Sequence, residues 1–525
     1  MMARMKRLFL HHGTAVGVLA LLALAAWLRF YGITFGLPHP LCRPDENTIG
    51  VAAWRVVAGD LNPHFFSYPS LFIYAVAAAY RVFSLLTGCG AAGGAAPSNP
   101  PIALLLVARV LAATLGALTP LLVFLVARRC FGKATALAAA FLMSICYLHV
   151  RDSHFGVTDV PMTFFALAAV LLILRAYETR ALRDYAWAGV LTGMATATKY
   201  GARVLGAPML AAHLLAAQGR PLRALADCRL WLFGLLAVGA FLLCTPYALL
   251  DATTFLSDFT RESRHLADGH PVDGAVLILG RGLWYHARYT LPYGMGWALF
   301  LSGWGGLVAA TGRDWRRALV LFLFPLAFYV TAGRGYAVFV RYMVPVLPYL
   351  CIGAAVLVRA LAGRIATRPL AVGLTTGALT LLLAAASVDH AVRFDHILAR
   401  RDNRLIAADW LRTHIPTGKT IAQNGSLVGQ VLLDAPLTPF TARENHAGRR
   451  PDYMVIQRHP LRYTSMPDWL ERELRADYHA VQTFQAFDPA APGNWYDMQD
   501  AFYVPFVGFK GIQRPGPNFT VYERN

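Results

Sequence analysis

The sequence predicts a polytopic α-helical membrane protein that carries a water-soluble α/β domain at its C-terminus. The chain has 525 residues, of which 57% are hydrophobic and only 15% charged, and this composition excludes an ordinary soluble globule. Apolar runs long enough to cross a hydrocarbon core about 30 Å thick recur between residues 15 and 386. The remainder is polar and lacks such a run, so we divide the chain into a membrane domain, 1–388, and a soluble domain, 389–525.

The net charge of +19 raises the question of a nucleic-acid partner. Much of the Lys and Arg stands in short clusters between apolar runs, such as MMARMKR at the N-terminus and ARRCFGK at 127–133. Clusters of this kind mark the cytoplasmic ends of membrane spans. The charge is therefore a topology signal, and we predict no nucleic-acid binding.

The apolar runs give about eleven predicted spans when the basic clusters are placed on the cytoplasmic side. The run at 69–86 is treated as a helix along the outer membrane surface, because counting it as a span would place ARRCFGK outside. A periplasmic loop with juxtamembrane helices then covers 37–101. The predicted spans are 15–36, 102–126, 134–149, 160–174, 186–198, 204–217, 230–250, 294–310, 318–331, 344–358 and 370–386.

This topology has one consequence for chemistry. Two acids and three cations that stand far apart in the sequence are predicted to lie on the same, periplasmic face; they are Asp45, Asp159, Lys199, Arg334 and Arg341. The soluble domain falls on that face too. The whole protein is expected to be a multi-pass component of a bacterial inner membrane, with an uncleaved signal anchor at its start.

The stretch CRPDENTIG, 42–50, places two acids directly after the first span. Pro followed by acids is also a common helix start, because the free N–H groups and the helix dipole favour negative charge there. The side chains of adjacent helical residues point about 100° apart, so Asp45 and Glu46 cannot have the same role in a site. On its own this motif favours the ordinary helix start.

Three further motifs place polar residues at predicted span ends. RDSHFGVTD, 151–159, ends in Asp159, for which a helix N-cap is the plain interpretation. TKYGA, 198–202, contains Lys199, where snorkelling to the interface is the ordinary explanation. RYMVPVLP, 341–348, contains Arg341 beside two prolines, which a simple hydrophobic anchor explains less well.

The order of PDE, YPSLFIY at 68–74, RDSHFGVTD, TKYGA and RYMVPVLP resembles the GT-C glycosyltransferases that use polyprenyl-phosphate sugars. The bacterial relatives of protein O-mannosyltransferases and of the aminoarabinose transferase that acts on lipid A are the most similar members. The resemblance covers roughly 15–370. It implies an inverting transfer of a hexose or pentose from a polyprenyl-phosphate donor to an acceptor hydroxyl of a glycan, lipid or protein.

The resemblance also implies roles for individual residues. Asp45 corresponds to the proposed general base, and Glu46 and Asp159 to two further catalytic acids. Lys199 and Arg341 match positions whose cations face the lipid phosphate. The other candidates for substrate contacts within these regions are Tyr68, Arg151, His154, Arg334 and Tyr342.

Two other functions stay open from the residues alone. A polymerase or ligase that moves whole lipid-linked oligosaccharides could share the fold class and would differ in the size of its donor. A transporter would also be polytopic and basic, but transporters usually place ionisable residues at mid-membrane and contain repeats. Here the charges cluster at span ends, and we find no clear repeat.

No cofactor is predicted, and a divalent metal is left open. FSYPS, 66–70, departs from the Glu-Lys-Pro of the aminoarabinose transferases and is closer to the Tyr-Pro-Pro-Leu of mannosyltransferase-like members, so no metal ligands are assigned. The seven cysteines show no CxxC spacing, which argues against a zinc site. A disulfide between Cys42 and Cys89 is conceivable only if both face an oxidising compartment.

The soluble domain begins with an amphipathic pattern in which Leu405, Ala408 and Leu411 share one face, followed by a Pro-Thr-Gly turn into a strand. Further strands are predicted at 453–457, 479–485 and 518–523. We assign no catalytic residue here. Acceptor binding and structural capping of the membrane domain are equally open as roles for this domain.

Overall fold

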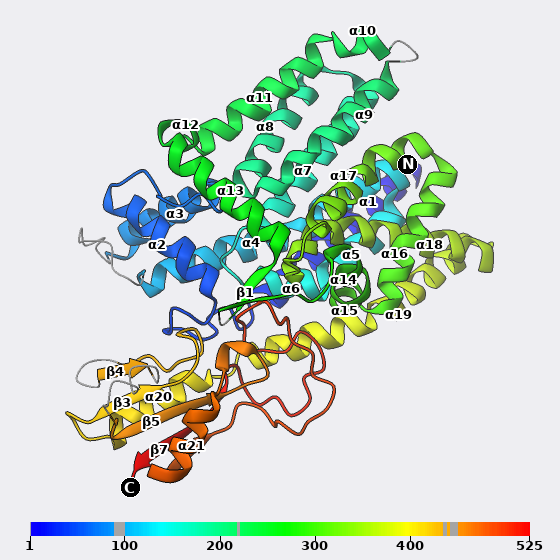
Figure 1. Cartoon of the computed structure of the whole chain (residues 1–525). Helices are drawn as coiled ribbons and strands as arrows, with labels where there is room; N and C mark the ends of the chain where they lie inside the picture. Colours follow the sequence, from blue (N-terminus) through cyan, green and yellow to red (C-terminus); the bar gives the residue numbers. More distant parts are fainter. Residues whose placement is uncertain (1, 89–99, 218–220, 273, 434–437, 442–449) are drawn as a thin grey trace.

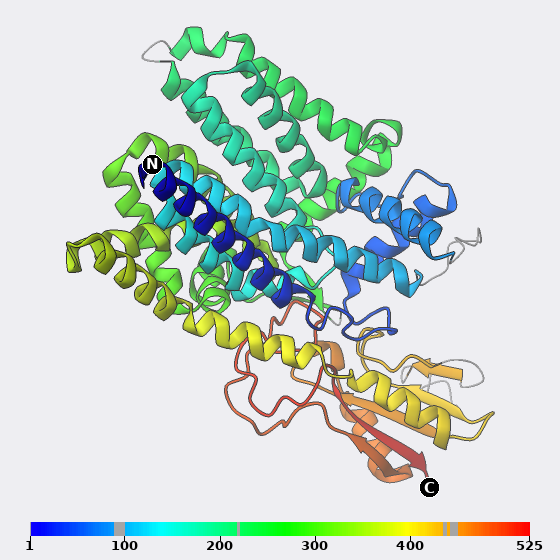
Figure 2. The same cartoon turned by 180° about the vertical axis from the view of Figure 1, so that it is seen from behind.

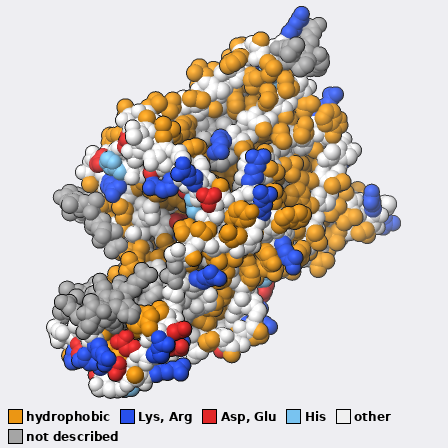
Figure 3. All heavy atoms as spheres, viewed as in Figure 1, with side chains coloured by type: hydrophobic (Ala, Val, Ile, Leu, Met, Phe, Trp, Pro, Cys, Tyr) orange, Lys and Arg blue, Asp and Glu red, His pale blue; other side chains and the backbone are white. Residues whose placement is uncertain are grey.

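The computed structural model describes residues 2–88, 100–217, 221–272, 274–433, 438–441 and 450–525. It confirms the predicted fold class, because a large helical part carries a small mixed sheet at the C-terminal end (Figure 1). Hydrophobic side chains cover much of the helical part, whereas charged side chains of both signs gather on the C-terminal domain (Figure 3). A surface of this kind suits a protein whose helices lie in lipid and whose sheet domain lies in water.

The long apolar helices carry the membrane part. Within the described residues, six helical stretches are long and apolar enough to cross a membrane, and seven if the bent pair α5–α6 counts as one span. The sequence suggested about eleven, because it also counted shorter runs. The main helices are α1 (Met2–Phe30), α4 (Ile102–Phe131), α5 (Lys133–Ile145), α6 (Tyr147–Ser153), α7 (Asp159–Thr179), α8 (Leu182–Thr198), α9 (Gly206–Ala216), α11 (Cys228–Cys244), α16 (Trp297–Arg313), α17 (Trp315–Gly333), α18 (Leu347–Ile365) and α19 (Pro369–Leu398).

Shorter elements cover one end of these helices and build the site. The turn α5–α6 bends by 54° at Cys146 and so directs RDSHFGVTD across that end. The elements are α2 (Pro44–Ala58), α3 (Leu71–Thr87), η1 (Tyr200–Leu205), α10 (Pro221–Leu225), α12 (Tyr247–Leu250), α13 (Ala252–Asp268), β1 (His270–Val272), β2 (Ala275–Leu277), α14 (Gly282–Tyr285), η2 (His286–Thr290), α15 (Leu291–Met295) and η3 (Val340–Val346).

Small residues bring α16 and α18 into close contact. A Cβ atom added at Gly306 would lie 1.7 Å from the carbonyl oxygen of Gly353, and one added at Gly353 would lie 2.3 Å from that of Gly303. Only glycine leaves room for two helix backbones at this separation. Close backbone approach through small residues is a standard way to associate helices in lipid, where burial of apolar surface supplies little driving force.

The C-terminal domain is a five-stranded mixed sheet with the strand order β4-β3-β5-β7-β6. β3 pairs in parallel with β4 and β5, and β7 pairs antiparallel with β5 and β6. Each predicted strand of this domain has a counterpart. Its elements are α20 (Asn403–His414), β3 (Thr420–Gln423), β4 (Thr438–Thr441), β5 (Tyr453–Arg458), η5 (Arg462–Thr464), α21 (Asp468–Asp477), β6 (Tyr478–Phe484) and β7 (Asn518–Arg524).

Alternation along the strands explains how one helix covers each face of this sheet. Val455 of β5 packs with Leu411 of α20, whereas its neighbour Met454 packs with Leu470 of α21. Successive strand residues point to opposite faces, so a continuous apolar strand such as β5 needs cover on both sides.

The segment between β6 and β7, residues 485–517, fastens the sheet domain to the membrane domain. Its Phe502 and Phe506 belong to the same apolar core as the membrane helices, and the hydroxyl of Tyr147 donates a 2.7 Å hydrogen bond to the carbonyl oxygen of Phe506. Helix α19 also runs continuously past the predicted boundary at residue 389 as far as Leu398, and it leads directly into the C-terminal domain (Figure 2). The two parts therefore share a core.

Candidate active site

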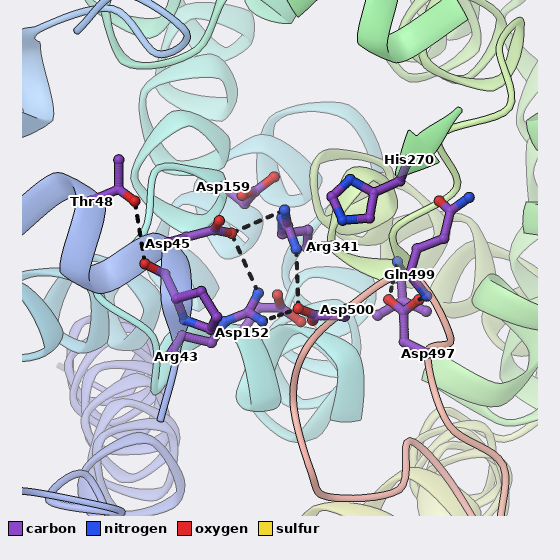
Figure 4. Close-up of polar contacts among 12 residues, drawn as sticks. Arg43, Asp45, Thr48, Asp152, Asp159, His270, Arg341, Asp497, Gln499 and Asp500 are labelled. Carbon is purple, nitrogen blue, oxygen red and sulfur yellow. Dashed lines mark hydrogen bonds and ion pairs between the residues drawn. The ribbon is translucent and has the colours of Figure 1, made fainter. Parts of the chain in front are cut away.

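Asp45 stands in the first turn of α2, at the rim of a cavity on the C-terminal-domain side of the helices. Pro44 begins the helix, where its fixed φ angle and missing N–H cost nothing. The Asp45 side chain is 28% exposed and its Oδ2 lies 3.0 Å from Nη2 of Arg341. Nη2 of Arg43 lies 3.8 Å from the same oxygen. The carboxylate is thus held by two cations while remaining open to solvent (Figure 4).

Glu46 points away from this cavity, and we do not retain it as a catalytic residue. Its carboxylate is fully buried and accepts hydrogen bonds from Nε and Nη2 of Arg109, the latter at 2.7 Å. It also accepts one from the backbone N–H of Gly156 at 2.8 Å. A Cβ at Gly156 would lie 2.7 Å from the Cβ of Ala108, so only glycine permits this approach. Glu46 therefore ties α2 to α4 and to the loop before α7.

Asp159 and Lys199 form a second pair. Asp159 is the first residue of α7 and Lys199 follows the last residue of α8; the Lys199 Nζ donates to Oδ1 of Asp159 at 2.5 Å. The same ammonium lies 4.8 Å from the ring centre of Tyr342 and 5.8 Å from that of Tyr68. Aromatic faces and a carboxylate together stabilise this cation at the end of its helix.

Arg341 occupies the centre of the site. It lies in η3, its guanidinium is 4.0 Å from the ring centre of Phe339, and only 5% of its side chain is exposed. Besides Asp45 it contacts Asp500, with Nη1 3.6 Å from Oδ1. A buried guanidinium with five donors can serve two carboxylates at once, and here it links the membrane domain to the C-terminal domain.

Asp500, in the segment 485–517, is one of the site residues that the sequence did not predict; Arg43 is another. Asp500 forms ion pairs with Arg43 and Arg341, and its Oδ2 lies 3.5 Å from Nη2 of Arg151. Burial alone would raise the pKa of Asp500, but the three arginines outweigh it and lower the pKa to about 2. The signal in the sequence was NWYDMQDAFYVPF, 494–506, an aromatic stretch with four amide or acidic residues inside a polar domain.

Two adjoining cavities connect these groups, and Tyr68, Glu262 and Tyr342 line both. The first, which we name the acid cavity, is lined by Asp45 and Arg341, by His265 and His270, and by residues of the C-terminal domain that include Asp500, Ser426, Val428 and Tyr463. The second, the lipid-side cavity, is lined by Lys199 and Arg203 with mainly apolar neighbours, Val204, Phe259, Leu266, Phe328 and Ala332.

A chain of hydrogen bonds borders the acid cavity. His265 Nε2 and His270 Nδ1 are 2.9 Å apart, and His270 Nε2 is 3.1 Å from the hydroxyl of Tyr463. Burial, together with the charges of His265 and Arg341, lowers the pKa of His270 to about 4. His270 is accordingly a neutral hydrogen-bonding group at physiological pH.

The other predicted site residues lie in different surroundings. Arg151 is buried behind the acid cavity, where it pairs with Asp152 at 3.1 Å and with Asp500. His154 is buried, and its Nδ1 and Nε2 lie 3.0 and 2.9 Å from the backbone carbonyl oxygens of Val150 and Tyr31, so both ring nitrogens face the protein's own backbone. Arg334 is exposed at the end of α17 and lines neither cavity. We therefore do not retain His154 and Arg334 as substrate-binding residues.

No group of three or more His, Cys, Asp or Glu side chains within the described residues has the geometry to hold a metal ion. Cys42 carries a buried thiol that lies 3.3 Å from the carbonyl oxygen of Gly36. Its suggested partner, Cys89, lies outside the described residues.

Comparisons with known proteins agree with this architecture. Residues 103–248 match the model of the family described as dolichyl-phosphate-mannose-protein mannosyltransferase. The apo oligosaccharyltransferase of Archaeoglobus fulgidus has a TM-score of 0.53 at 13% identity, with 97% of this chain and 88% of that chain covered. ArnT from Cupriavidus metallidurans bound to undecaprenyl phosphate has a TM-score of 0.52 at 14% identity, with 96% of this chain and 97% of that chain covered.

No curated protein sequence matches this chain. The structural likenesses, at these low identities, establish the fold, and the family model covers the helices that present Asp159 and Lys199. Together they confirm the resemblance found in the sequence. The chain is a multi-pass membrane protein with the fold of these glycosyltransferases, and its residues 103–248 resemble the protein mannosyltransferase family.

Proposed function

We propose that this protein transfers a single sugar from a polyprenyl-phosphate donor to an acceptor hydroxyl at the periplasmic face of a bacterial inner membrane, with inversion at the anomeric carbon. One observation carries the proposal. A solvent-open carboxylate, Asp45, lines the acid cavity, and a cation, Lys199, lines the lipid-side cavity; Tyr68 and Tyr342 line both. A base and a phosphate site are thus placed next to each other.

The lipid-side cavity suits a lipid phosphate. Lys199 and Arg203 supply positive charge, and the apolar side chains of Val204, Leu266 and Phe328 offer a surface for an isoprenoid chain. A phosphate that approaches Lys199 would compete with Asp159 for the ammonium. The complex of ArnT with undecaprenyl phosphate supports this class of donor.

The chemistry follows from the order of the groups. Asp45 takes the proton of the acceptor hydroxyl while the oxygen attacks the anomeric carbon, and the bond from that carbon to the phosphate oxygen breaks. The lipid phosphate leaves with the electron pair, and Lys199 and Arg341 stabilise its charge through charge-assisted hydrogen bonds. A single in-line displacement inverts the anomeric centre. A positioned base contributes about 10² to 10⁴ in rate.

The C-terminal domain completes the acceptor side. Ser426, Val428 and Tyr463 line the acid cavity opposite α2, and Nη1 of Arg404 fixes this loop by donating to the carbonyl oxygen of Val428 at 2.6 Å. An acceptor that reaches Asp45 would pass these side chains. We infer that the domain selects the acceptor, whose class is a glycan, lipid or protein hydroxyl.

The direct test is turnover of a defined donor. Purified protein in nanodiscs would be incubated with radiolabelled undecaprenyl-phosphate hexose and an extract of the cell envelope as the acceptor source. We expect release of undecaprenyl phosphate together with label in a new product. Absence of release from each of several hexose and pentose donors would contradict the proposal.

The sequence left whole-oligosaccharide transfer as a second function, and the fold is shared with an oligosaccharyltransferase. A lipid-linked oligosaccharide donor therefore belongs in the same assay. Faster consumption of that donor than of any undecaprenyl-phosphate monosaccharide would favour the second function over the one proposed.

A further inference from the structure

We propose that Asp500, which the C-terminal domain contributes, is a positioning residue for the transfer reaction: it shares Arg43 and Arg341 with Asp45 and thereby keeps Asp45 available as a base. This inference rests on the proposed function and adds a residue from outside the membrane domain to it. Arg43 and Arg341 each lie between the two carboxylates of Asp45 and Asp500 (Figure 4).

The charges around the two acids are evenly matched. Three guanidinium groups, those of Arg43, Arg151 and Arg341, face three carboxylates, those of Asp45, Asp152 and Asp500. Of these six side chains only Asp45 is substantially exposed, at 28%; the others are 5% exposed or less. Asp500 is thus an internal counterion for the arginines that Asp45 also contacts.

Without Asp500, both shared arginines would have Asp45 as their remaining nearby partner in this set. An ion-paired carboxylate is a weaker base than one whose cations are engaged elsewhere, because the charged form is stabilised. Loss of Asp500 should therefore slow proton transfer. It should also move the acid limb of the pH profile to lower pH.

Other titratable groups also face Asp45, and all of them remain in place in Asp500→Asn. They are Tyr68 after α2, Glu262 and His265 of α13, His270 of β1, Tyr342 of η3 and Tyr463 of the C-terminal domain. The Asp159–Lys199 pair stands beyond Tyr342. Asp500 also acts through its charge on His270 and Tyr463, so a shift in Asp500→Asn measures the loss of that charge together with the change in the partners of the arginines.

Each of the two shared arginines has a buried N–H group that makes no hydrogen bond. Arg43 Nη2 and Arg341 Nη1 are buried and make no hydrogen bond, and the same holds for Asp500 Oδ2. Their ion-pair distances of 3.5 to 3.8 Å are longer than hydrogen bonds. Each shared arginine thus makes one close contact, Arg43 with Asp500 and Arg341 with Asp45, and one longer contact with the other carboxylate, so each has a free donor that can move toward either acid as an acceptor binds.

The test is the pH dependence of kcat and KM in the undecaprenyl-phosphate hexose assay. For Asp500→Asn we expect kcat to fall about tenfold and the acid limb to move down by about one pH unit, the equivalent of one tenfold change in proton affinity. KM for the donor should change less than twofold. Asp500→Glu keeps the charge and should bring the acid limb back toward its wild-type position.

Asp488→Asn is the matched control, because Asp488 is an exposed acid of the same 485–517 segment and lines neither cavity. Thermal unfolding of each variant separates loss of fold from loss of rate. An Asp500→Asn enzyme that is folded and has the acid limb of Asp488→Asn would overturn the inference. An inactive wild-type enzyme would instead contradict the proposed function.

Discussion

Arg341 Nη2 lies 3.0 Å from Asp45 Oδ2, and this contact joins the first juxtamembrane helix of the chain to the turn before one of its last membrane helices. It explains how a carboxylate at a helix N-terminus is oriented toward the acid cavity and not along its own helix. The same guanidinium also serves Asp500. The geometry of the reaction centre therefore depends on three segments that are distant in the sequence.

Substitution of Arg341 by Lys should impair catalysis even though the charge is kept. An ammonium is a point charge without the planar fork of a guanidinium and cannot bridge Asp45 and Asp500 in the same way. We expect kcat to fall at least tenfold, the equivalent of about 1.4 kcal/mol in the transition state. Arg364→Lys, at the exposed end of α18, is the control. Equal kcat in the two variants would argue against the bridging role.

Lys199→Met should weaken binding of the lipid phosphate. A hydrogen bond to a charged group is worth about 1.5–3 kcal/mol, so the Kd for undecaprenyl phosphate should rise by about 10- to 100-fold. Isothermal titration in detergent measures it directly. Lys133→Met removes an exposed lysine at the start of α5 and should leave the Kd unchanged. An unchanged Kd in Lys199→Met would place the phosphate elsewhere.

Glu46→Gln should reduce stability more than it reduces the rate per folded molecule. The change leaves Arg109 as a buried charge with only part of its partners, and breaking a buried ion pair in this way costs about 3–5 kcal/mol. Thermal unfolding in detergent would show a lower Tm. The double substitution Glu46→Leu with Arg109→Leu removes both charges and should recover part of the loss. A stable Glu46→Gln enzyme without activity would instead make Glu46 catalytic.

Asp497→Asn should change how stability depends on pH. Burial, together with the charge of Asp500, raises the pKa of Asp497 to about 6, so between pH 4 and 6 the native state holds a proton that the unfolded state has lost. Wild-type stability should therefore fall as the pH rises through that window. The amide of Asn cannot ionise, and it can still accept the hydrogen bond from Val340 N–H. The difference in Tm between Asp497→Asn and wild type should therefore increase in favour of Asp497→Asn as the pH rises from 4 to 7. A constant difference would show that Asp497 is ionised throughout.

The membrane part of the site could be predicted because topology constrains it. Basic clusters fix which span ends share a face, and this sufficed to bring Asp45, Asp159, Lys199 and Arg341 together. Helical spacing also separated Asp45 from Glu46: the structure turns one to the cavity and the other into the core. The roles of single residues were harder to predict. The sequence does not distinguish a buried histidine whose ring nitrogens face two backbone carbonyls, such as His154, from a histidine that binds a substrate.

The contribution of the C-terminal domain could not be predicted. Asp500 reaches the site only because Phe502 and Phe506 anchor the segment 485–517 in the core of the membrane helices, and no periodicity in the sequence encodes that docking. The structure has six or seven helical stretches within the described residues that meet the length and composition of a span, against about eleven predicted. Runs such as 204–217 are apolar, but the corresponding α9 has only 11 residues, and composition alone does not reveal where a helix breaks.

The most direct test of the account is a single-turnover comparison of wild type with Asp45→Asn on radiolabelled undecaprenyl-phosphate hexose. Asp60→Asn, an exposed acid after α2, serves as the control. We predict that Asp45→Asn binds undecaprenyl phosphate with the wild-type Kd but transfers the sugar about 10² to 10⁴ times more slowly, as expected for loss of a positioned base. Transfer by Asp45→Asn at the rate of Asp60→Asn would contradict the assignment of Asp45 as the base.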